Sequence, residues 1–208
     1  MSKWSPDGKE IAFYGFPSGS NAKLYIVSAD GGSPRELIPE DTSPQFDDSW
    51  SPDGTRIVFG GVPSDPNSSI RIVDVRTKQI SKLPDSKGLF APGWSPDGRY
   101  IAAMPFTSGG LRIFDFASQK WDEIAKISMA FPNWSKNSDY VYFLHEEDQP
   151  SVMRVRIHDH KVGRVADLKS FRQAGFYGGW LGMEPDDSPL LLRDTGTQEI
   201  YALDWQAP

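Results

Sequence analysis

Few residues in this chain have the types and spacing that chemistry on a substrate requires. The three histidines are His145, His158 and His160, and the last two stand in the run HDH. Two imidazoles could bind a metal ion, but this run falls at an expected turn between strands and no third ligand can be named. No G-x-S-x-G nucleophile elbow is present, and GFPSGS at 15–20 has the wrong spacing for one. The sequence therefore predicts no catalytic residue, no metal site and no cofactor.

Carboxylates gather at one place in the chain, at Glu40, Asp41, Asp47 and Asp48. Hard cations such as Ca²⁺ prefer several carboxylate oxygens, so one interpretation is a calcium site or a contact with a cationic partner. The other interpretation is a solvated acidic loop. The loop is favoured because no D-x-[DN]-x-[DN]-G motif is present.

Composition excludes several classes of protein. The 208 residues include 22 Lys plus Arg against 28 Asp plus Glu, a net charge of −6, which argues against direct binding of nucleic acid. Because cysteine is absent, disulfides, thiolate catalysis and cysteine-based zinc sites are excluded. No apolar run approaches the ~18–20 residues of a membrane helix, so no membrane insertion is expected. The chain as written has no signal peptide and is expected in the cytoplasm, or in the periplasm if its N-terminus is truncated.

A repeat runs along the chain. The string WSPDG stands at 4–8, 50–54 and 94–98, and Trp134 and Trp180 begin two further units, at intervals of 46, 44, 40 and 46 residues. A second block follows each tryptophan in nearly constant phase, namely LYIVSADGGSPREL, IRIVDVRTKQISKL, LRIFDFASQKWDEI, VMRVRIHDHKVGRV and IYALDW. Two blocks in phase over five units indicate an internal repeat.

Each unit is predicted to contain four strands. β-rich runs such as RIVFGGV and IRIVDV are followed by a third run such as QISKL, and SPQFDDSW leads into the next tryptophan. Four antiparallel strands in about 40–45 residues are typical of a β-propeller blade. We therefore predict an all-β fold, a β-propeller of about five four-stranded antiparallel blades in one domain over 1–208. The approximate blades are 1–42, 43–87, 88–127, 128–173 and 174–208.

The repeated string itself has the chemistry of a turn. Ser-Pro-Asp-Gly fits a type I turn closed by a left-handed glycine, which makes a hairpin between the innermost strand and the next. The tryptophan ends the inner strand and is expected to pack on the neighbouring blade. In the fourth copy Asn137 is expected to adopt the left-handed conformation, and the fifth copy shifts its turn to 184–189. The structural residues of the repeat are Trp4, Gly8, Trp50, Gly54, Trp94, Gly98, Trp134 and Trp180.

The pattern W-S-P-D-G-x-x-I-A-F, an LYIVD-like run and R-x-L resembles the PD40 (WD40-like) repeats of TolB-type β-propellers, over essentially the whole chain. The ending WLGMEPDDSPLLLRDTGTQEIYALDW is similar to the C-terminus of bacterial multidomain regulators and kinases that carry such a propeller. The resemblance implies a scaffold or sensor module. The chain departs from TolB in having neither its N-terminal α/β domain nor a signal peptide.

Closure of the ring is left open by the sequence. The last unit offers three strands, at about 175–183, 189–194 and 198–205, and only MSK precedes Trp4. A small five-bladed ring and an incomplete ring from a larger propeller are both compatible with this, and the incomplete ring is favoured. An incomplete ring would be expected to self-associate through its open blade edges.

The face opposite the hairpins is the expected binding face, because its loops vary in length and composition while the hairpins repeat. Phe46, Phe90 and Phe176 stand four residues before a tryptophan, and Phe131 and Tyr177 stand three before one. These rings either bind a ligand or fill the channel. The candidate binding residues are Tyr14, Phe16, Asp47, Asp48, Phe90, Phe106, Phe131, His145, Arg172 and Tyr177.

The function predicted from these features is a non-enzymatic propeller that binds a protein or peptide partner through its variable loops. The alternatives are an enzyme-associated propeller, either the gating propeller of a prolyl-oligopeptidase-type peptidase or a propeller lyase, and a periplasmic TolB-like translocation component. A lyase would need histidine and carboxylate side chains clustered at the channel.

Overall fold

The computed structural model describes residues 2–62, 65–106, 109–147, 149–174 and 179–196. The described residues form an all-β structure with four four-stranded antiparallel sheets and one two-stranded sheet. None of them belongs to a helix long and apolar enough to cross a membrane. The expected all-β propeller architecture is confirmed.

Each four-stranded sheet orders its strands as the chain does. The first sheet contains β1 (Lys3–Trp4), β2 (Glu10–Gly15), β3 (Lys23–Ser28) and β4 (Arg35–Glu36). The second contains β5 (Phe46–Trp50), β6 (Arg56–Gly60), β7 (Arg71–Asp74) and β8 (Ile80–Lys82). The third contains β9 (Leu89–Trp94), β10 (Tyr100–Pro105), β11 (Leu111–Asp115) and β12 (Lys120–Ala125). The fourth contains β13 (Ala130–Trp134), β14 (Tyr140–His145), β15 (Ser151–Arg156) and β16 (Val162–Asp167), and the two-stranded sheet contains β17 (Leu181–Met183) and β18 (Pro189–Leu191).

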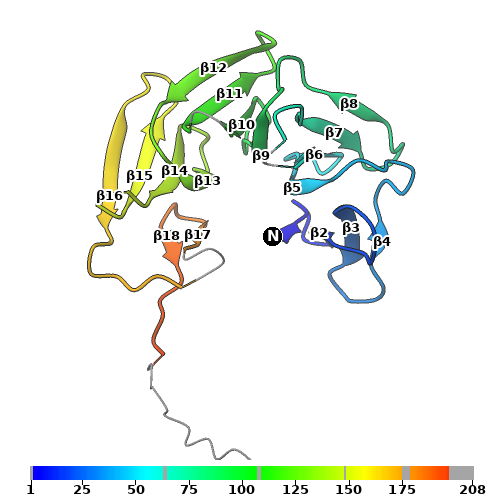
Figure 1. Ribbon diagram of the computed structural model, residues 1–208, viewed down its shortest axis with the longest axis horizontal. Coiled ribbons are helices and arrows are strands. Elements are labelled where there is room, and N and C mark those ends of the chain that lie inside the picture. The colour runs from blue at the N-terminus through cyan, green and yellow to red at the C-terminus, as the bar shows by residue number, and fades with distance from the viewer. Residues whose placement is uncertain (1, 63–64, 107–108, 148, 175–178, 197–208) are drawn as a thin grey trace, which may run out of the picture.

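The sheets follow one another around an arc, with β5, β9 and β13 toward its centre and β8, β12 and β16 at its outside (Figure 1). The described residues form four complete blades, where about five were expected. The last unit contributes β17, β18 and an isolated bridge between Gln173 and Arg193. The strand expected at 198–205 lies outside the described residues.

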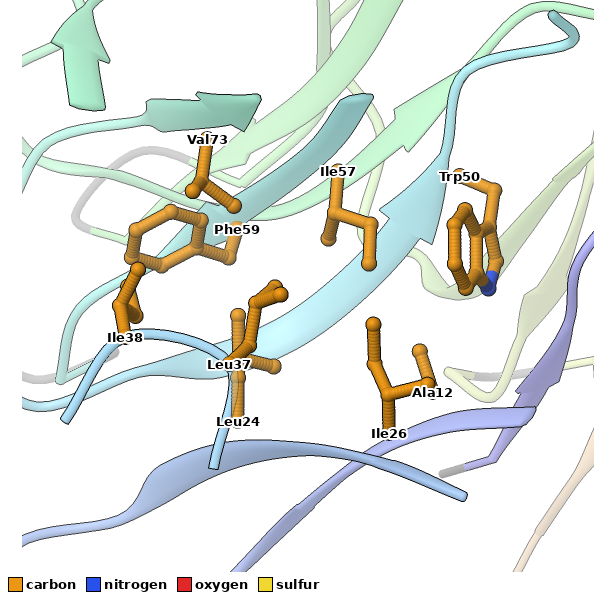
Figure 2. Packing of buried hydrophobic residues seen from close by; sticks show 9 residues of the cluster. All are labelled: Ala12, Leu24, Ile26, Leu37, Ile38, Trp50, Ile57, Phe59 and Val73. Carbon is orange, nitrogen blue, oxygen red and sulfur yellow. The ribbon is translucent and has the colours of Figure 1, made fainter. Parts of the chain in front are cut away.

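The hydrophobic core lies between the sheets. Figure 2 shows the first of four clusters, in which Leu24 and Ile26 of the first sheet meet Ile57 and Phe59 of the second. All four are essentially inaccessible to solvent. Burying one such side chain stabilises the fold by about 1.5–3 kcal/mol. Similar clusters join the second sheet to the third, the third to the fourth and the fourth to the two-stranded sheet.

The SPDG strings form the predicted hairpins between inner and second strands. In the first copy the Ser5 hydroxyl donates to Asp7 at 2.7 Å and the Gly8 amide donates to the Ser5 carbonyl at 2.9 Å. Gly8, Gly54 and Gly98 have φ of 70°, 70° and 76°, where a side chain would strain the backbone. Glycine therefore lets these three turns adopt the left-handed conformation without strain.

In the fourth and fifth turns, residues other than glycine adopt the left-handed conformation. In the fourth, Ser138 adopts the left-handed conformation with φ 63°. The expectation for Asn137 is wrong, because its side chain takes the role of the aspartate and accepts from the Ser135 hydroxyl at 2.8 Å. In the fifth, Asp187 is left-handed with φ 67° and accepts at 2.7 Å from the Lys136 amide of the neighbouring hairpin.

The hairpins also join neighbouring sheets. A Cβ placed on Gly98 would lie 3.2 Å from Pro52 Cγ, so these two turns are in contact. The Asp97 amide of the third hairpin donates to the Ser138 hydroxyl of the fourth at 3.1 Å. The repeated string is thus a turn and a contact between blades.

The tryptophans that end the inner strands bind neighbouring blades in two of the copies. Trp50 donates its indole N–H to the Lys3 carbonyl at 3.1 Å, and Trp134 donates to the Gly93 carbonyl at 2.9 Å. Both acceptors belong to the preceding inner strand. These indoles fix the spacing of adjacent inner strands as well as burying apolar surface.

The other copies differ. Trp94 is buried in the core between the second and third sheets, but its indole N–H bonds to Gly98 in its own hairpin at 3.3 Å. Trp4 is 61% exposed, and Trp180 is partly buried just before β17. The prediction of inter-blade packing therefore holds for the tryptophans of the second to fourth sheets.

Candidate functional site

Strand direction separates two sets of connections. The hairpins that join first to second and third to fourth strands lie at one end of each sheet. The loops that join second to third strands, and one sheet to the next, lie at the other end. We call the first end the hairpin face and the second the variable-loop face.

Three aromatic rings from two blades meet on the variable-loop face. Tyr14 at the end of β2 lies 5.3 Å from Phe46 at the start of β5, measured between ring centroids. Phe16, in the loop after β2, lies 6.0 Å from Tyr14 and 5.9 Å from Phe46. Phe16 is 70% exposed. The group therefore presents an aromatic surface to solvent at the junction of the first two sheets.

A second aromatic pair continues this surface. Phe90 of β9 lies 6.2 Å from Phe106, which is 47% exposed. Gly60 lies between the pair and the first group, because a Cβ on Gly60 would be 3.8 Å from both Phe90 Cα and the Phe46 carbonyl oxygen. We call these five residues the aromatic band: Tyr14, Phe16, Phe46, Phe90 and Phe106.

A repeated β-bulge lies beside the band on the inner strands. Asp47, Ala91 and Phe131 each stand three residues before the tryptophan and have φ of 53°, 49° and 53°. The strand pairing shifts register at the same place in all three sheets. A left-handed residue other than glycine costs roughly 1–2 kcal/mol, and a bulge bends its strand. Nothing in these three residue types signals the bulge, and sequence reasoning missed it.

The bulge in β5 is followed by a buried carboxyl group. Asp48 is 4% exposed, and neither of its carboxylate oxygens has a hydrogen-bond partner among the described residues. Burial raises the pKa of Asp48 to about 6, and Asp47 adds to this effect while Lys3 opposes it. Burial also raises the pKa of Asp47. Two adjacent carboxyl groups therefore share one poorly solvated place next to Phe46.

The four acids around the start of β5 do not form one site. Asp41 Oδ2 lies 2.6 Å from Arg71 Nη1, and this arginine also donates to the Pro44 carbonyl at 2.6 Å. That pair holds the linker into β5 and is separate from Asp47 and Asp48. No group of three or more His, Asp or Glu side chains suited to a metal ion occurs in the part of the chain described.

The other candidate residues are not brought to the band. Phe131 is partly buried and packs on the core cluster that contains Leu144. His145 lies at the end of β14, with Nδ1 2.9 Å from the Ser128 carbonyl oxygen. Arg172 follows β16 and binds Asp194, Nη2 to Oδ2, at 2.7 Å. Tyr177 and Phe176 lie outside the described residues.

The three histidines do not form a cluster. His158 and His160 are exposed at the turn after β15, on the hairpin face, while His145 lies on the variable-loop face. His160 Nε2 is 3.5 Å from Asp122 Oδ2, a contact of two exposed side chains. A propeller lyase would need these groups together at the channel.

Each face contains a hollow, and sequence reasoning identified neither of the two. One, of about 440 Å³, lies between the third and fourth sheets on the hairpin face and includes Arg99, Tyr100 and Asp115. Two of its charged groups bind each other, since Arg99 Nη2 lies 3.0 Å from Asp115 Oδ2, and the Arg99 guanidinium covers the Tyr100 ring at 4.8 Å. The other, of about 710 Å³, is shallow and lies on the variable-loop face beside Lys23.

Solved structures share this architecture. A protein assigned as TolB from Agrobacterium tumefaciens superposes with a TM-score of 0.68 and 22% identity, over 80% of this chain and 64% of that one. TolB from Acinetobacter baumannii superposes with a TM-score of 0.71 and 18% identity, over 90% of this chain and 46% of that one. The fold is that of a TolB-type β-propeller.

The resemblance is one of fold. No protein-family model and no curated protein sequence matches the chain. The chain spans 64% and 46% of the two TolB structures. A prolyl endopeptidase superposes with a TM-score of 0.55 and 14% identity, over 88% of this chain and 30% of the peptidase.

Proposed function

We propose that this chain is a non-enzymatic binding module that holds a protein or peptide partner on its variable-loop face. The observation that carries the proposal is the aromatic band, which leaves Phe16 and Phe106 exposed on a rigid β-scaffold. Exposed aromatic side chains are enriched in protein interfaces because each buries a large area at a small cost in conformational entropy.

The contrast between the two faces supports the same conclusion. On the hairpin face, polar side chains of the SPDG turns already serve the fold, as Asp53 does by accepting from the Ser51 hydroxyl at 2.5 Å and from the Thr55 amide at 3.0 Å. On the variable-loop face, the rings of Phe16 and Phe106 have exposed surface that a partner could bury.

An enzyme-associated propeller is the second candidate, favoured by the superposition on a prolyl endopeptidase. In that case the band would face a catalytic domain of the same protein instead of a separate partner. A catalytic domain encoded in adjoining sequence would support this candidate. The separation of the histidines argues against the propeller lyase.

A displayed peptide library tests the proposal directly. We expect purified chain to select peptides whose binding, measured by fluorescence anisotropy, weakens about tenfold or more when Phe16 and Phe106 are both changed to alanine. Ile80→Ala, which removes an exposed apolar side chain from the outer strand β8, is the matched control and should leave binding unchanged. Selection of peptides whose binding the double variant does not alter would contradict a partner site on this face.

A further inference from the structure

Asp48 is an unusual group to bury. Its carboxylate oxygens are removed from solvent without a hydrogen bond to any residue that the structure describes, and neither Asp47 nor Asp48 forms an ion pair with a described basic residue. A buried polar group without a partner costs free energy, and a buried charge costs more. Asp48 is one such group, and the partly buried Asp47 precedes it on β5.

These carboxyls follow Phe46 of the aromatic band directly along β5, and Lys3 is the described cation whose charge acts on both. Asp47 directly follows Phe46, whose ring lies 5.3 Å from Tyr14 and 5.9 Å from Phe16. Aromatic faces attract cations, most strongly where water is excluded. Carboxylate charge and aromatic surface therefore favour the same kind of ligand at one place.

An organic cation fits this arrangement better than a metal ion. Ca²⁺ takes six to eight oxygen ligands, whereas the place offers two neighbouring carboxyls, one of them covered, and three rings. A guanidinium or ammonium group can lie against a ring and at the same time donate hydrogen bonds to a carboxylate. The chain's net charge of −6 also attracts basic segments.

We propose that Asp47, Asp48, Tyr14, Phe16 and Phe46 form a recognition site for an arginine or lysine side chain that a partner presents between apolar residues. The site rests on the proposed function and specifies its ligand. The partner's cation contacts Asp47 and the rings. Asp48 attracts the cation electrostatically from its buried position on β5, where water screens its charge poorly. The apolar neighbours of the cation cover Phe16 and extend along the band toward Phe90 and Phe106.

Neutral analogues of a selected peptide test whether the positive charge of its basic residue contributes to binding. We expect peptides selected by the chain to contain a basic residue flanked by apolar ones, and replacement of that arginine by citrulline to weaken binding about tenfold. Raising the salt concentration from about 0.05 to 0.5 M should weaken the arginine peptide more than the citrulline peptide.

A double-mutant cycle tests whether Asp47 is the group that interacts with the arginine of the peptide. In Asp47→Asn the loss caused by citrulline should largely disappear, because the two groups no longer interact. Asp30→Asn, an exposed aspartate in the turn between β3 and β4 on the hairpin face, is the matched control and should leave the citrulline effect intact. Circular dichroism and thermal melts establish that each variant is folded.

The outcomes separate the two proposals. Selected peptides that bind the variable-loop face without a basic residue, or whose citrulline effect survives in Asp47→Asn, would overturn the cation site and leave the proposed function standing. Failure to select any peptide, or selection of peptides insensitive to Phe16 and Phe106, would overturn the proposed function itself.

Discussion

Asp48 links ligand binding to stability, because its buried negative charge attracts a cation but destabilises the folded state when no cation is bound. The folded state raises the pKa of Asp48 from 3.8 to about 6, so folding favours the protonated form. Between these two values the unfolded chain loses the proton and the folded chain keeps it. Stability contributed by Asp48 is therefore present at low pH and lost as pH rises toward 6 and above.

We predict that Asp48→Asn makes the protein more stable at neutral pH. The two chains should be about equally stable near pH 4, and the difference should grow to roughly 3 kcal/mol by pH 7, at 1.36 kcal/mol per pKa unit. Urea denaturation of both chains at a series of pH values measures this difference. Asp30→Asn supplies the baseline, and a pH-independent difference for Asp48→Asn would contradict the assignment.

Asp53 titrates in the opposite direction. Hydrogen bonds from the Ser51 hydroxyl and the Thr55 amide lower the pKa of Asp53 to about 2, so its stabilising contribution is present above pH 4 and lost as pH falls toward 2. We predict a carboxyl titration midpoint near 2 by NMR. Ser51→Ala should move that midpoint upward, and a midpoint that stays in place would show that the turn does not set it.

At the scale of the strand, the repeated bulge is the feature that the sequence could not reveal. WSPDG spacing predicted the hairpins because Pro, Asp and Gly each have a preferred place in a turn. In contrast, the left-handed Ala91 and Phe131 are residues without preference for that conformation, so tertiary packing must impose it. In the fourth turn, residue preference alone also points to the wrong residue, because Ser138 is left-handed and not Asn137.

The left-handed conformation of Ala91 in the bulge predicts how its replacement by glycine changes the free energy of unfolding. Glycine adopts φ of 49° without strain, so Ala91→Gly should remove a cost of roughly 1–2 kcal/mol while adding about 0.5–1 kcal/mol of unfolded-state entropy. We expect a small net stabilisation, about 0.5 kcal/mol, in thermal or urea melts. Ala102→Gly, at a buried position of β10 that is not left-handed, should destabilise the fold. Equal losses in both variants would contradict a strained bulge.

At the scale of the whole molecule, strand connectivity made the variable-loop face predictable, whereas the side-chain contacts on that face depend on packing between sheets. Connectivity alone placed the variable loops opposite the hairpins, and Tyr14, Phe16 and Phe90 were identified from that argument. The contact of Phe16 with Phe46 of the next sheet, and the absence of a partner for Asp48, depend on how adjacent sheets pack. No local pattern encodes a contact between sheets.

The core clusters each join two neighbouring sheets, so stability should be distributed between nearest neighbours as in other repeat proteins. Ile57 and Ile101 occupy equivalent positions, seven residues after Trp50 and Trp94, and both are fully buried. Either change to alanine should cost about 2–5 kcal/mol. We predict that Ile57→Ala lowers amide hydrogen-exchange protection mainly in the first and second sheets and that Ile101→Ala lowers it mainly in the second and third. Equal loss throughout the chain in both variants would mean instead that the arc unfolds as one cooperative unit, in which case a partner bound to the aromatic band would stabilise every sheet alike.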